Sequence, residues 1–274
     1  MFVIKTTGER EEFSREKIIR TCLRAGVSKE TAEKIAAEAE LHAYEGITTQ
    51  EILQFVLRLL SRKEVAAAAK YDLKGSIMRL GPAGFLFEAF VGELLKEYGY
   101  KTKTHVFLNG KCIKHEIDVI TEKQGETTII ECKYHNAPGI FTGVKDVLYT
   151  YARFLDVKEG AAIGKSRQVN AVSLFSNTKF SSDAEKYGKC KGIELVGWRY
   201  PQDGGLEKLI EEKKLYPITV LRTLSREDLQ KFSASKMMLC KDLLRYRPED
   251  MKKLTGVSEG KIKAAAREAE LILA

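Results

Sequence analysis

The fold of this chain is decided by residues 128–134, Thr128-Ile129-Ile130-Glu131-Cys132-Lys133-Tyr134. A β-strand turns successive side chains to opposite faces, so Ile129, Glu131 and Lys133 share one face of this segment. A carboxylate and an ammonium group on a half-buried face cost several kcal/mol in desolvation unless something binds them. The segment therefore predicts a strand that carries a polar site.

A second polar interruption lies in the apolar run just before this segment. Asp118 stands within Ile117-Asp118-Val119-Ile120, in a stretch from 113 to 121 that is predicted to be a strand. If the two strands pair, Asp118 and Glu131 meet at one edge of the sheet. Two carboxylates suit Mg²⁺ or Mn²⁺, which prefer oxygen ligands. Lys133 is then expected to hold or polarise the attacking water beside a scissile phosphate.

Glu88 is an acid on the apolar face of a helix that is predicted at residues 85–98. It lies three residues before Val91 and seven before Leu95, whereas Glu93 falls on the outer side of the helix. An acid on an inward face needs a partner. A metal ion is one such partner, and an inward arginine or a backbone amide is the alternative.

The segments around these residues alternate between helix and strand. Three strands follow the helix at 85–98, and Asn109-Gly110 is expected to form the hairpin turn between the first two. A long helix from Val144 onward, a strand at 169–175, a short helix and a last strand complete the order αβββαβαβ. This order predicts a mixed sheet flanked by helices.

The spacing Asp118-x(12)-Glu131-x-Lys133, placed after a helix, resembles the PD-(D/E)XK nuclease superfamily. Two further stretches, Gly84–Glu88 and Phe175–Ala184, narrow the resemblance to its Mrr-like restriction endonuclease branch. The resemblance implies a restriction-endonuclease-like α/β fold and Mg²⁺-dependent hydrolysis of phosphodiester bonds in DNA. No proline precedes Asp118, a departure that is common in the superfamily.

The same resemblance implies roles for individual residues. Asp118 and Glu131 correspond to metal ligands, together with the backbone carbonyl of Cys132. Lys133 corresponds to the catalytic base or stabiliser, and Glu88 to an auxiliary acid.

The first 81 residues are predicted to form a short β-hairpin followed by four short helices. The fourth helix is expected from Arg62 to Leu80, with Gly81-Pro82 as its stop. The expected N-caps of the other three helices are Ser14, Ser28 and Thr49.

Three stretches of this segment, Val3–Gly8, Phe13–Ile18 and Tyr44–Ile52, resemble the ATP-cone, a regulatory nucleotide-binding module. Thr6-Thr7 replaces the Arg-Asp pair that is usual in the family. Ammonium groups suit phosphates, and a helix start offers amides for anionic oxygen. The alternative is a cone that no longer binds nucleotide and serves as an interaction bundle. The resemblance implies that ATP or dATP is surrounded by Lys5, Glu11, Lys17 and Thr49.

Residues 206–274 are predicted to be helical. Leu254–Ser258 resembles the turn of a helix-hairpin-helix motif, which binds DNA phosphate without reading sequence. The alternative is a small bundle core with lysines on a solvated face. The predicted helices lie at 225–232, 235–245, 248–254 and 258–273. The expected DNA contacts of this region are Gly256, Lys261 and Lys263. His135, on the catalytic face of the nuclease segment, is also expected to contact phosphate, and a plain surface histidine is the alternative there.

Composition sets the class of protein. The chain has 274 residues, and 46 Lys and Arg against 38 Asp and Glu give a net charge of +8, which fits a polyanionic partner such as DNA. No apolar run approaches the ~20 residues of a membrane span. The N-terminus lacks the basic-then-apolar order of a signal peptide, so a cytoplasmic location without a membrane partner is expected.

Five cysteines without a C-x-x-C pair indicate free thiols. A zinc site from Cys112-x-x-His115 and Cys132-x-x-His135 is the alternative.

Together these observations predict an α+β multidomain protein. Its expected parts are an ATP-cone at 1–81, an Mrr-like nuclease domain at 82–205 and a helical DNA-binding region at 206–274. The predicted function is a metal-dependent DNA endonuclease regulated by ATP or a deoxynucleotide. A homodimer is expected, because cutting both strands usually takes two active sites. The alternative is a catalytically inactive, nucleotide-responsive DNA-binding regulator.

Overall fold

The computed structural model describes residues 1–62, 64–81 and 85–274. The predicted helix stop at Pro82 and the motif residue Gly84 lie outside the described residues. Among the described residues, no helix combines the length and apolar character that a bilayer crossing needs.

The described chain forms two compact units. The central unit comprises Ile77–Pro217 and Phe232–Leu239. The other, here called the helical unit, combines Met1–Ser76 with Ile218–Lys231 and Cys240–Ala274. Both helices and strands occur, so the predicted α+β multidomain fold is confirmed. The division at residues 82 and 206 stays a prediction.

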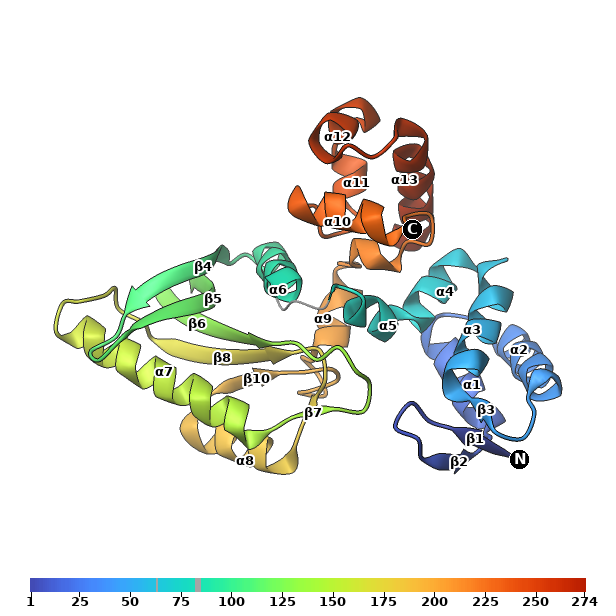
Figure 1. Cartoon of the computed structure of the whole chain (residues 1–274), viewed down its shortest axis with the longest axis horizontal. Coiled ribbons are helices and arrows are strands. Elements are labelled where there is room, and N and C mark those ends of the chain that lie inside the picture. Colours follow the sequence, from blue (N-terminus) through green and yellow to red (C-terminus); the bar gives the residue numbers. More distant parts are fainter. Residues whose placement is uncertain (63, 82–84) are drawn as a thin grey trace. The chain divides into compact units, whose positions relative to one another are not determined.

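A five-stranded mixed sheet forms the middle of the central unit (Figure 1). Its strands are β4 (Lys101–Asn109), β5 (Lys114–Lys123), β6 (Glu126–Lys133), β8 (Ala171–Ser176) and β10 (Glu194–Val196). The strand order is β10-β8-β6-β5-β4. Strands β4, β5 and β6 pair antiparallel, whereas β6, β8 and β10 pair parallel. The predicted mixed sheet is confirmed.

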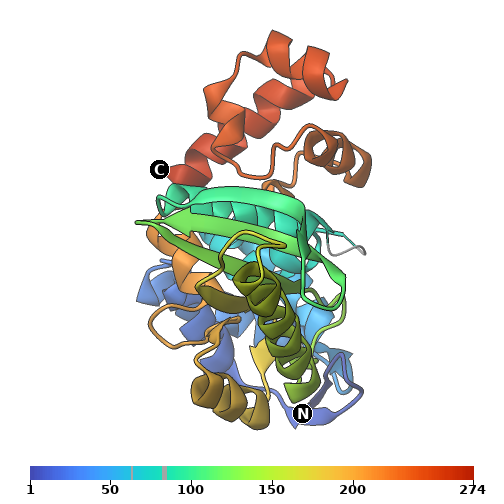
Figure 2. The same cartoon turned by 90° about the vertical axis from the view of Figure 1, so that its left-hand side faces the viewer.

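Helices cover both faces of this sheet. Helix α6 (Phe85–Glu97) packs on β4, β5 and β6, and α7 (Val144–Ala162) lies against the opposite face with α8 (Ser182–Lys191) beside it (Figure 2). Two short strands, β7 (Phe141–Thr142) and β9 (Lys179–Phe180), pair in parallel outside the main sheet. The expected order αβββαβαβ is otherwise observed.

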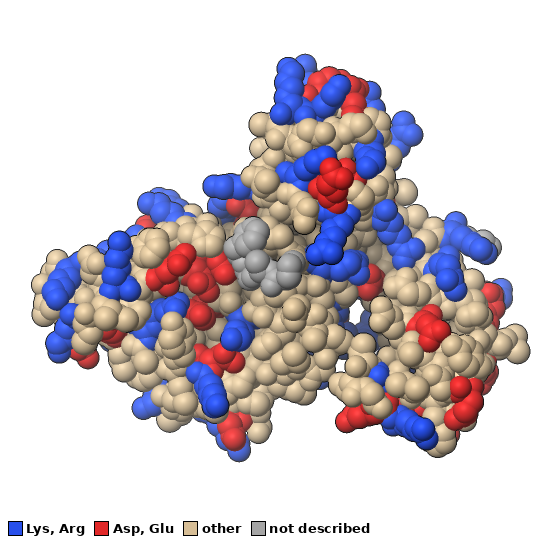
Figure 3. Space-filling view, viewed as in Figure 1, with Lys and Arg blue, Asp and Glu red and all other residues tan. Residues whose placement is uncertain are grey.

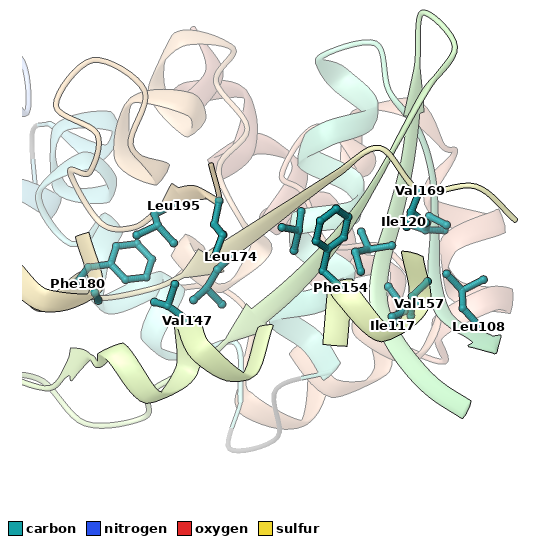
Figure 4. Close-up of a cluster of buried hydrophobic side chains, with 14 residues drawn as sticks. Leu108, Ile117, Ile120, Val147, Phe154, Val157, Val169, Leu174, Phe180 and Leu195 are labelled. Carbon is teal, nitrogen blue, oxygen red and sulfur yellow. The ribbon is translucent and has the colours of Figure 1, made fainter. Parts of the chain in front are cut away.

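The core of the central unit lies between α7 and the sheet. Val147, Phe154 and Val157 of α7 pack against strand residues such as Ile117 and Leu174, all of them buried (Figure 4). Each such side chain contributes about 1.5–3 kcal/mol when it leaves water. This layer fixes α7 against β5, β6 and β8.

The loop between β4 and β5 corrects one prediction. It has four residues, Gly110–Ile113, rather than a two-residue turn at Asn109-Gly110. The Asp156 carboxylate accepts hydrogen bonds from the backbone N–H of Cys112 (2.8 Å) and of Ile113 (3.3 Å), which shapes this longer loop. Gly110 does not adopt a positive φ. Glycine is needed there because a Cβ would collide with the Asp156 carboxylate.

The helical unit begins with a three-stranded sheet and a group of short helices. Strands β1 (Phe2–Ile4), β2 (Arg10–Glu12) and β3 (Ile47–Thr48) lie in the order β2-β1-β3. The helices are α1 (Arg15–Arg24), α2 (Lys29–His42), α3 (Thr49–Ser61), α4 (Val65–Tyr71) and α5 (Leu73–Met78), the last of which continues into the central unit. Ser14 and Ser28 are N-caps, as predicted.

Two predictions for this segment are wrong. The N-cap of α3 is Thr48 rather than Thr49, because the Thr48 hydroxyl accepts from the backbone N–H of Glu51 while the Glu51 carboxylate accepts from that of Thr48. The single helix expected from Arg62 to Leu80 is divided at Asp72 into α4 and α5. Aspartate is a weak helix former, since its side chain competes for backbone hydrogen bonds.

The C-terminal residues are mostly helical, as expected, except at one place. The elements are α9 (Leu206–Glu212), the 3₁₀ helix η1 (Ile218–Val220), α10 (Arg226–Ala234), α11 (Asp242–Arg245), α12 (Pro248–Thr255) and α13 (Glu259–Leu273). The predicted helix at 235–245 is wrong, because only its last four residues are helical. Lys236 has a left-handed φ of 58°, and Leu239 bridges to Pro217. Four consecutive buried residues, Met237–Cys240, suit extended chain and not a helix with one inward face.

We expect Asp228→Ala to lower the free energy of unfolding of the helical unit by about 2 kcal/mol. The buried carboxylate accepts from Ser225 N–H (3.0 Å), Ser225 Oγ (2.6 Å) and Lys261 Nζ (2.7 Å). Although burial acts against ionisation, these hydrogen bonds hold the pKa of Asp228 at about 2. The contribution is therefore complete above the ordinary value of 3.8 and is lost as pH falls toward 2.

Urea unfolding at pH 7 and at pH 3 measures this contribution. The exposed Asp250, in the first turn of α12, provides the control variant Asp250→Ala. Equal stability of Asp228→Ala and the control at pH 7 would contradict the expectation.

Candidate active site

The pairing of β5 with β6 brings Asp118 and Glu131 to the same place in the sheet. The last registered pair is Val119 with Ile130, so Asp118 and Glu131 are the next residues along the two strands. The Asp118 carboxylate also accepts a hydrogen bond of 2.7 Å from the backbone N–H of Cys132. The expected pairing of the two strands is thus observed, with Asp118 fixed against the end of β6.

Glu131 faces α7, where an arginine holds it. Arg153 Nη1 donates to the Glu131 carboxylate, and Nη2 donates to the hydroxyl of Tyr149 at 2.5 Å. The guanidinium also lies over the Tyr149 ring, 4.7 Å from its centroid. Arg153 Nε is buried and has no hydrogen-bond partner within the described chain. An unsatisfied buried donor costs about 1–3 kcal/mol. The guanidinium of Arg153 therefore has the capacity for one more hydrogen bond.

Lys133 lies on the same face as Glu131, as the alternation along β6 predicts. Its Nζ is 2.9 Å from Oδ1 of Asp146, in the first turn of α7. Asp146, Tyr149 and Arg153 are three and four residues apart, so they form one stripe along α7. This stripe contacts both polar side chains of the strand.

Glu88 points inward from α6 and meets a histidine. Its side chain is 15% exposed, and its Oε2 lies 3.5 Å from Nδ1 of His105. The same nitrogen is 3.4 Å from Oε1 of Glu116. The inward position of Glu88 is therefore observed, and the neighbouring group is an imidazole rather than the arginine or amide considered from the sequence.

His105 lies at a break in β4. Its φ is 53°, a left-handed value that is uncommon outside glycine. The registered pairs Thr104 with Val119 and Val106 with Ile117 leave His105 opposite Asp118. Non-glycine residues held in such conformations cost about 1–3 kcal/mol and cluster at functional sites. The strain therefore coincides with the predicted catalytic aspartate.

The three carboxyl groups repel one another in a poorly solvated place. Burial, and then the charge of Asp118, raise the pKa of Glu131 to about 7 and that of Glu88 to about 7. Burial also raises the pKa of Asp118. Figure 3 shows acidic side chains gathered over β5 and β6 next to α6. Such an excess of buried negative charge is what a divalent cation relieves.

The donor set fits Mg²⁺ or Mn²⁺. Two carboxylates and the carbonyl of Cys132 are hard oxygen ligands of the type these ions prefer. In residues 1–62, 64–81 and 85–274, no three His, Cys, Asp or Glu side chains are arranged around one ion position. A site here would thus use two side chains and a backbone oxygen, and the ligand roles of Asp118, Glu131 and Cys132 stay predictions.

The zinc alternative does not fit. His115 Nε2 lies 2.7 Å from the Asp156 carboxylate, and His135 Nε2 lies 3.1 Å from the Thr142 hydroxyl. In the part of the chain that the structure describes, no three His, Cys, Asp or Glu side chains are placed to hold one metal ion, as a zinc site would need. All five cysteines are free, as the sequence indicates.

His135 belongs to a polar network that anchors the end of β6. Its backbone N–H donates to Asn177 Oδ1 (2.8 Å), and Asn177 Nδ2 donates to the His135 carbonyl (2.7 Å). Its ring meets Thr142, whose hydroxyl lies 2.6 Å from that of Ser176. Burial, and then the charge of Lys133, lower the pKa of His135, so it is neutral at pH 7. Its DNA contact stays a prediction.

The expected nucleotide residues lie near one another in the helical unit. Lys5 Nζ is 3.2 Å from Glu9 and 3.7 Å from Glu11, and Lys17 also pairs with Glu11. Thr49 follows Thr48, which pairs with Ile4 next to Lys5. Two lysines are thus held by acids at the start of the sheet, and their nucleotide contacts stay predictions.

The expected DNA-binding lysines of the C-terminal region are engaged in ion pairs. Lys261 binds Asp228, and Lys263 Nζ lies 2.5 Å from Glu259 one turn away. Gly256 has a φ of 71° and ends α12, the role that a glycine has at a helix C-terminus. The turn before α13 is present, and its binding of phosphate stays a prediction.

Four neighbours of the site were not singled out from the sequence. They are His105, Asp146, Tyr149 and Arg153. The spacing of the last three along a predicted helix was a usable signal, because charged and phenolic groups at three- and four-residue intervals share a face. Nothing local indicated that this face would meet Glu131.

We expect the unfolding free energy of the metal-free central unit to fall by about 5 kcal/mol between pH 5 and pH 8, roughly half of it from each of two glutamates. Glu131 and Glu88 have folded pKa values of about 7 against an ordinary 4.5, so the native state binds more protons in this window. Their favourable contribution is present below pH 4.5 and is lost as pH rises through 7. Thermal unfolding in EDTA across this range measures the change.

Glu131→Gln should flatten this pH dependence and raise stability at pH 8. Glu126→Gln, at the exposed start of the same strand, is the control and should keep the wild-type slope. An unchanged slope in Glu131→Gln would show that Glu131 does not titrate in this range.

Comparisons with known protein families divide the chain into three matched segments. Residues 1–73 match the ATP cone domain, and residues 83–199 match a restriction endonuclease domain. Residues 216–273 match the C-terminal domain of AF1548-like proteins. The resemblances to the ATP-cone and to Mrr-like restriction endonucleases are thereby confirmed.

Similar whole proteins come from Archaeoglobus fulgidus. An uncharacterized protein of this organism is 41% identical over 183 residues, which span 67% of this chain and 99% of the relative. A second, shorter one is 67% identical over 36 residues, or 13% of this chain and 77% of that protein. The crystal structure of the protein of unknown function AF1548 has 40% identity and a TM-score of 0.61, and the match covers 70% of this chain and 98% of that one. This chain therefore belongs to the AF1548-like family.

Proposed function

We propose that this protein is a metal-dependent DNA endonuclease that hydrolyses phosphodiester bonds. The observation that carries the proposal is the group of buried carboxyls at the junction of β5 and β6, next to Lys133. Asp118 and Glu131 follow paired strand residues, and burial, together with the charge of Asp118, raises the pKa of Glu131 and that of Glu88 to about 7. Perturbed acids beside a cation are typical of catalytic sites. The restriction endonuclease match at residues 83–199 supports the same reaction class.

The chemistry follows from the positions of the side chains. A divalent cation, when bound, supplies Lewis acidity to the phosphate and to the attacking water. Asp118, Glu131 and the Cys132 carbonyl would hold it. Lys133, whose side chain is 42% exposed, can turn from Asp146 toward a phosphate oxygen or the attacking water. Glu88 has a pKa of about 7 and can hold or release a proton at neutral pH.

The other parts of the chain are proposed to control and strengthen DNA binding. The ATP-cone is proposed to bind ATP or dATP through Lys5, Glu11, Lys17 and Thr49. Calorimetry with each nucleotide tests this proposal, and the absence of binding heat for both would reject it. Gly256, Lys261 and Lys263 of the helical unit are proposed to contact DNA phosphates, and so, separately, is His135 of the central unit. The DNA dissociation constant should then rise steeply with salt, because phosphate contacts release counterions.

A plasmid assay tests the proposed reaction. Supercoiled plasmid is incubated with purified protein in Mg²⁺, Mn²⁺ or EDTA, with and without ATP, alongside branched and modified DNA substrates. Cleavage that EDTA prevents supports the endonuclease. Retained DNA binding without cleavage on any substrate would instead support a nucleotide-responsive DNA-binding regulator. Light scattering with and without DNA tests the proposed homodimer.

A further inference from the structure

Arg153 forms an ion pair with the carboxylate of Glu131, which is one of the proposed metal ligands. Its side chain is 14% exposed and that of Glu131 is 19% exposed, so the ion pair is largely shielded from water. A guanidinium offers five N–H donors. One nitrogen meets Glu131, another meets Tyr149, and Nε has no partner in the described part of the chain.

The surroundings of this guanidinium leave it able to change partner. The Tyr149 ring lies beneath it at 4.7 Å and provides a flat surface that does not depend on Glu131. Arginine at the third turn of α7 is long enough to shift its head group while its stem stays packed. A purely structural arginine would be expected to satisfy all its buried donors.

We propose that Arg153 is a second phosphate-binding residue of the site: it holds Glu131 in the metal-free protein and turns to the scissile phosphate when a divalent cation binds that carboxylate. The proposal rests on the function proposed above. A phosphodiester offers two anionic oxygens, and the paired donors of a guanidinium match them. The unpaired Nε would then gain an acceptor. Arg153 and the cation thus compete for Glu131 and cooperate on DNA.

Binding of Mn²⁺ in the absence of DNA tests the competition. Mn²⁺ titrations of the full chain, followed by electron paramagnetic resonance, compare wild type with Arg153→Met and Arg153→Lys. Removing the competing charge should make Mn²⁺ binding about tenfold tighter in Arg153→Met, whereas Arg153→Lys should stay near wild type. Weaker or unchanged binding in Arg153→Met would overturn the proposal, because a residue that only supports the fold would weaken the site when removed.

DNA affinity tests the second half without relying on cleavage. In EDTA the guanidinium is held by Glu131, so Arg153→Met should change DNA affinity less than about twofold. With Ca²⁺ as the probe cation it should lower affinity about tenfold, and Arg153→Lys should restore part of the loss. An equal effect with and without Ca²⁺ would overturn the proposal.

Two controls separate the possible failures. Arg167 pairs with Glu122 on the same sheet, so Arg167→Met removes an ion-paired arginine away from the site and should leave Mn²⁺ binding unchanged. If wild type binds Mn²⁺ but cleaves no substrate, the proposed nuclease function fails while the Mn²⁺ and DNA affinities still decide the role of Arg153. If wild type cleaves DNA and Arg153→Met retains the wild-type rate, only the role of Arg153 is refuted.

Discussion

Replacing Glu131 by glutamine is expected to slow metal-dependent DNA cleavage by about 10⁴-fold and to change DNA affinity by less than about threefold. The substitution keeps the size of the side chain and removes the negative charge that the cation needs. It also leaves the basic surface of the protein intact, so DNA is still held. Single-turnover cleavage of plasmid in Mn²⁺ measures the rate, and fluorescence anisotropy in EDTA measures the affinity.

A matched substitution on the same strand provides the control. Glu126→Gln changes an exposed glutamate at the start of β6 and should cleave DNA at the wild-type rate. Circular dichroism melts confirm that both variants are folded. Cleavage by Glu131→Gln within about tenfold of wild type would remove Glu131 from the catalytic centre and refute its proposed role as a metal ligand.

The pairing of Asp118 with Glu131 could be predicted because it depends on local features. Strands β5 and β6 are joined by the two-residue turn Gln124-Gly125, and both residues have positive φ. A turn centred there places residues opposite each other when their numbers are equally distant from it. Asp118 and Glu131 meet this condition. The number of residues between them therefore predicts that they lie opposite each other in the β5–β6 pairing. Alternation along β6 then places Lys133 beside Glu131.

The partner of Glu131 could not be predicted, because it depends on how α7 is rotated. Apolar character alone does not identify the inward face of this helix, because Leu148 and Leu155 are 43% and 39% exposed whereas Phe154 is buried. Arg153 also lies inward, where it pairs with Glu131. This contact joins residues 22 positions apart, which a local pattern does not include.

The irregularity of β4 at His105 is visible in the pattern of polar and apolar residues along the strand. Thr102 and Thr104 lie near the Gly92 position of α6, whereas Val106 and Leu108 pack on the core beneath α7. All four have even numbers, so a regular strand would place them on one face. Their change from polar to apolar at His105 matches the reversal that the left-handed residue causes. The change of polarity at constant spacing therefore indicated an irregular strand beside Asp118.

We expect Gly160→Ala to lower the free energy of unfolding of the central unit by about 3 kcal/mol. Gly160 is buried in α7, and a Cβ there would lie 2.5 Å from the Asn109 carbonyl oxygen and 2.6 Å from the Gly110 carbonyl carbon. These are backbone atoms of the β4–β5 loop, which is tied to Asp156 and cannot turn aside as a side chain would. Alanine is the better helix former by about 1 kcal/mol, but this gain is smaller than the strain.

The opposite result is expected for a helical glycine with free space. Gly260 in α13 has no neighbour within 4 Å of a built Cβ, so Gly260→Ala should stabilise the helical unit by about 0.5 kcal/mol. Urea unfolding of both variants measures the two signs. Because α7 also carries Asp146 and Arg153, its displacement in Gly160→Ala should reduce cleavage as well as stability. If Gly160→Ala is as stable as wild type, the close contact between α7 and the hairpin is not what fixes this helix over the candidate site.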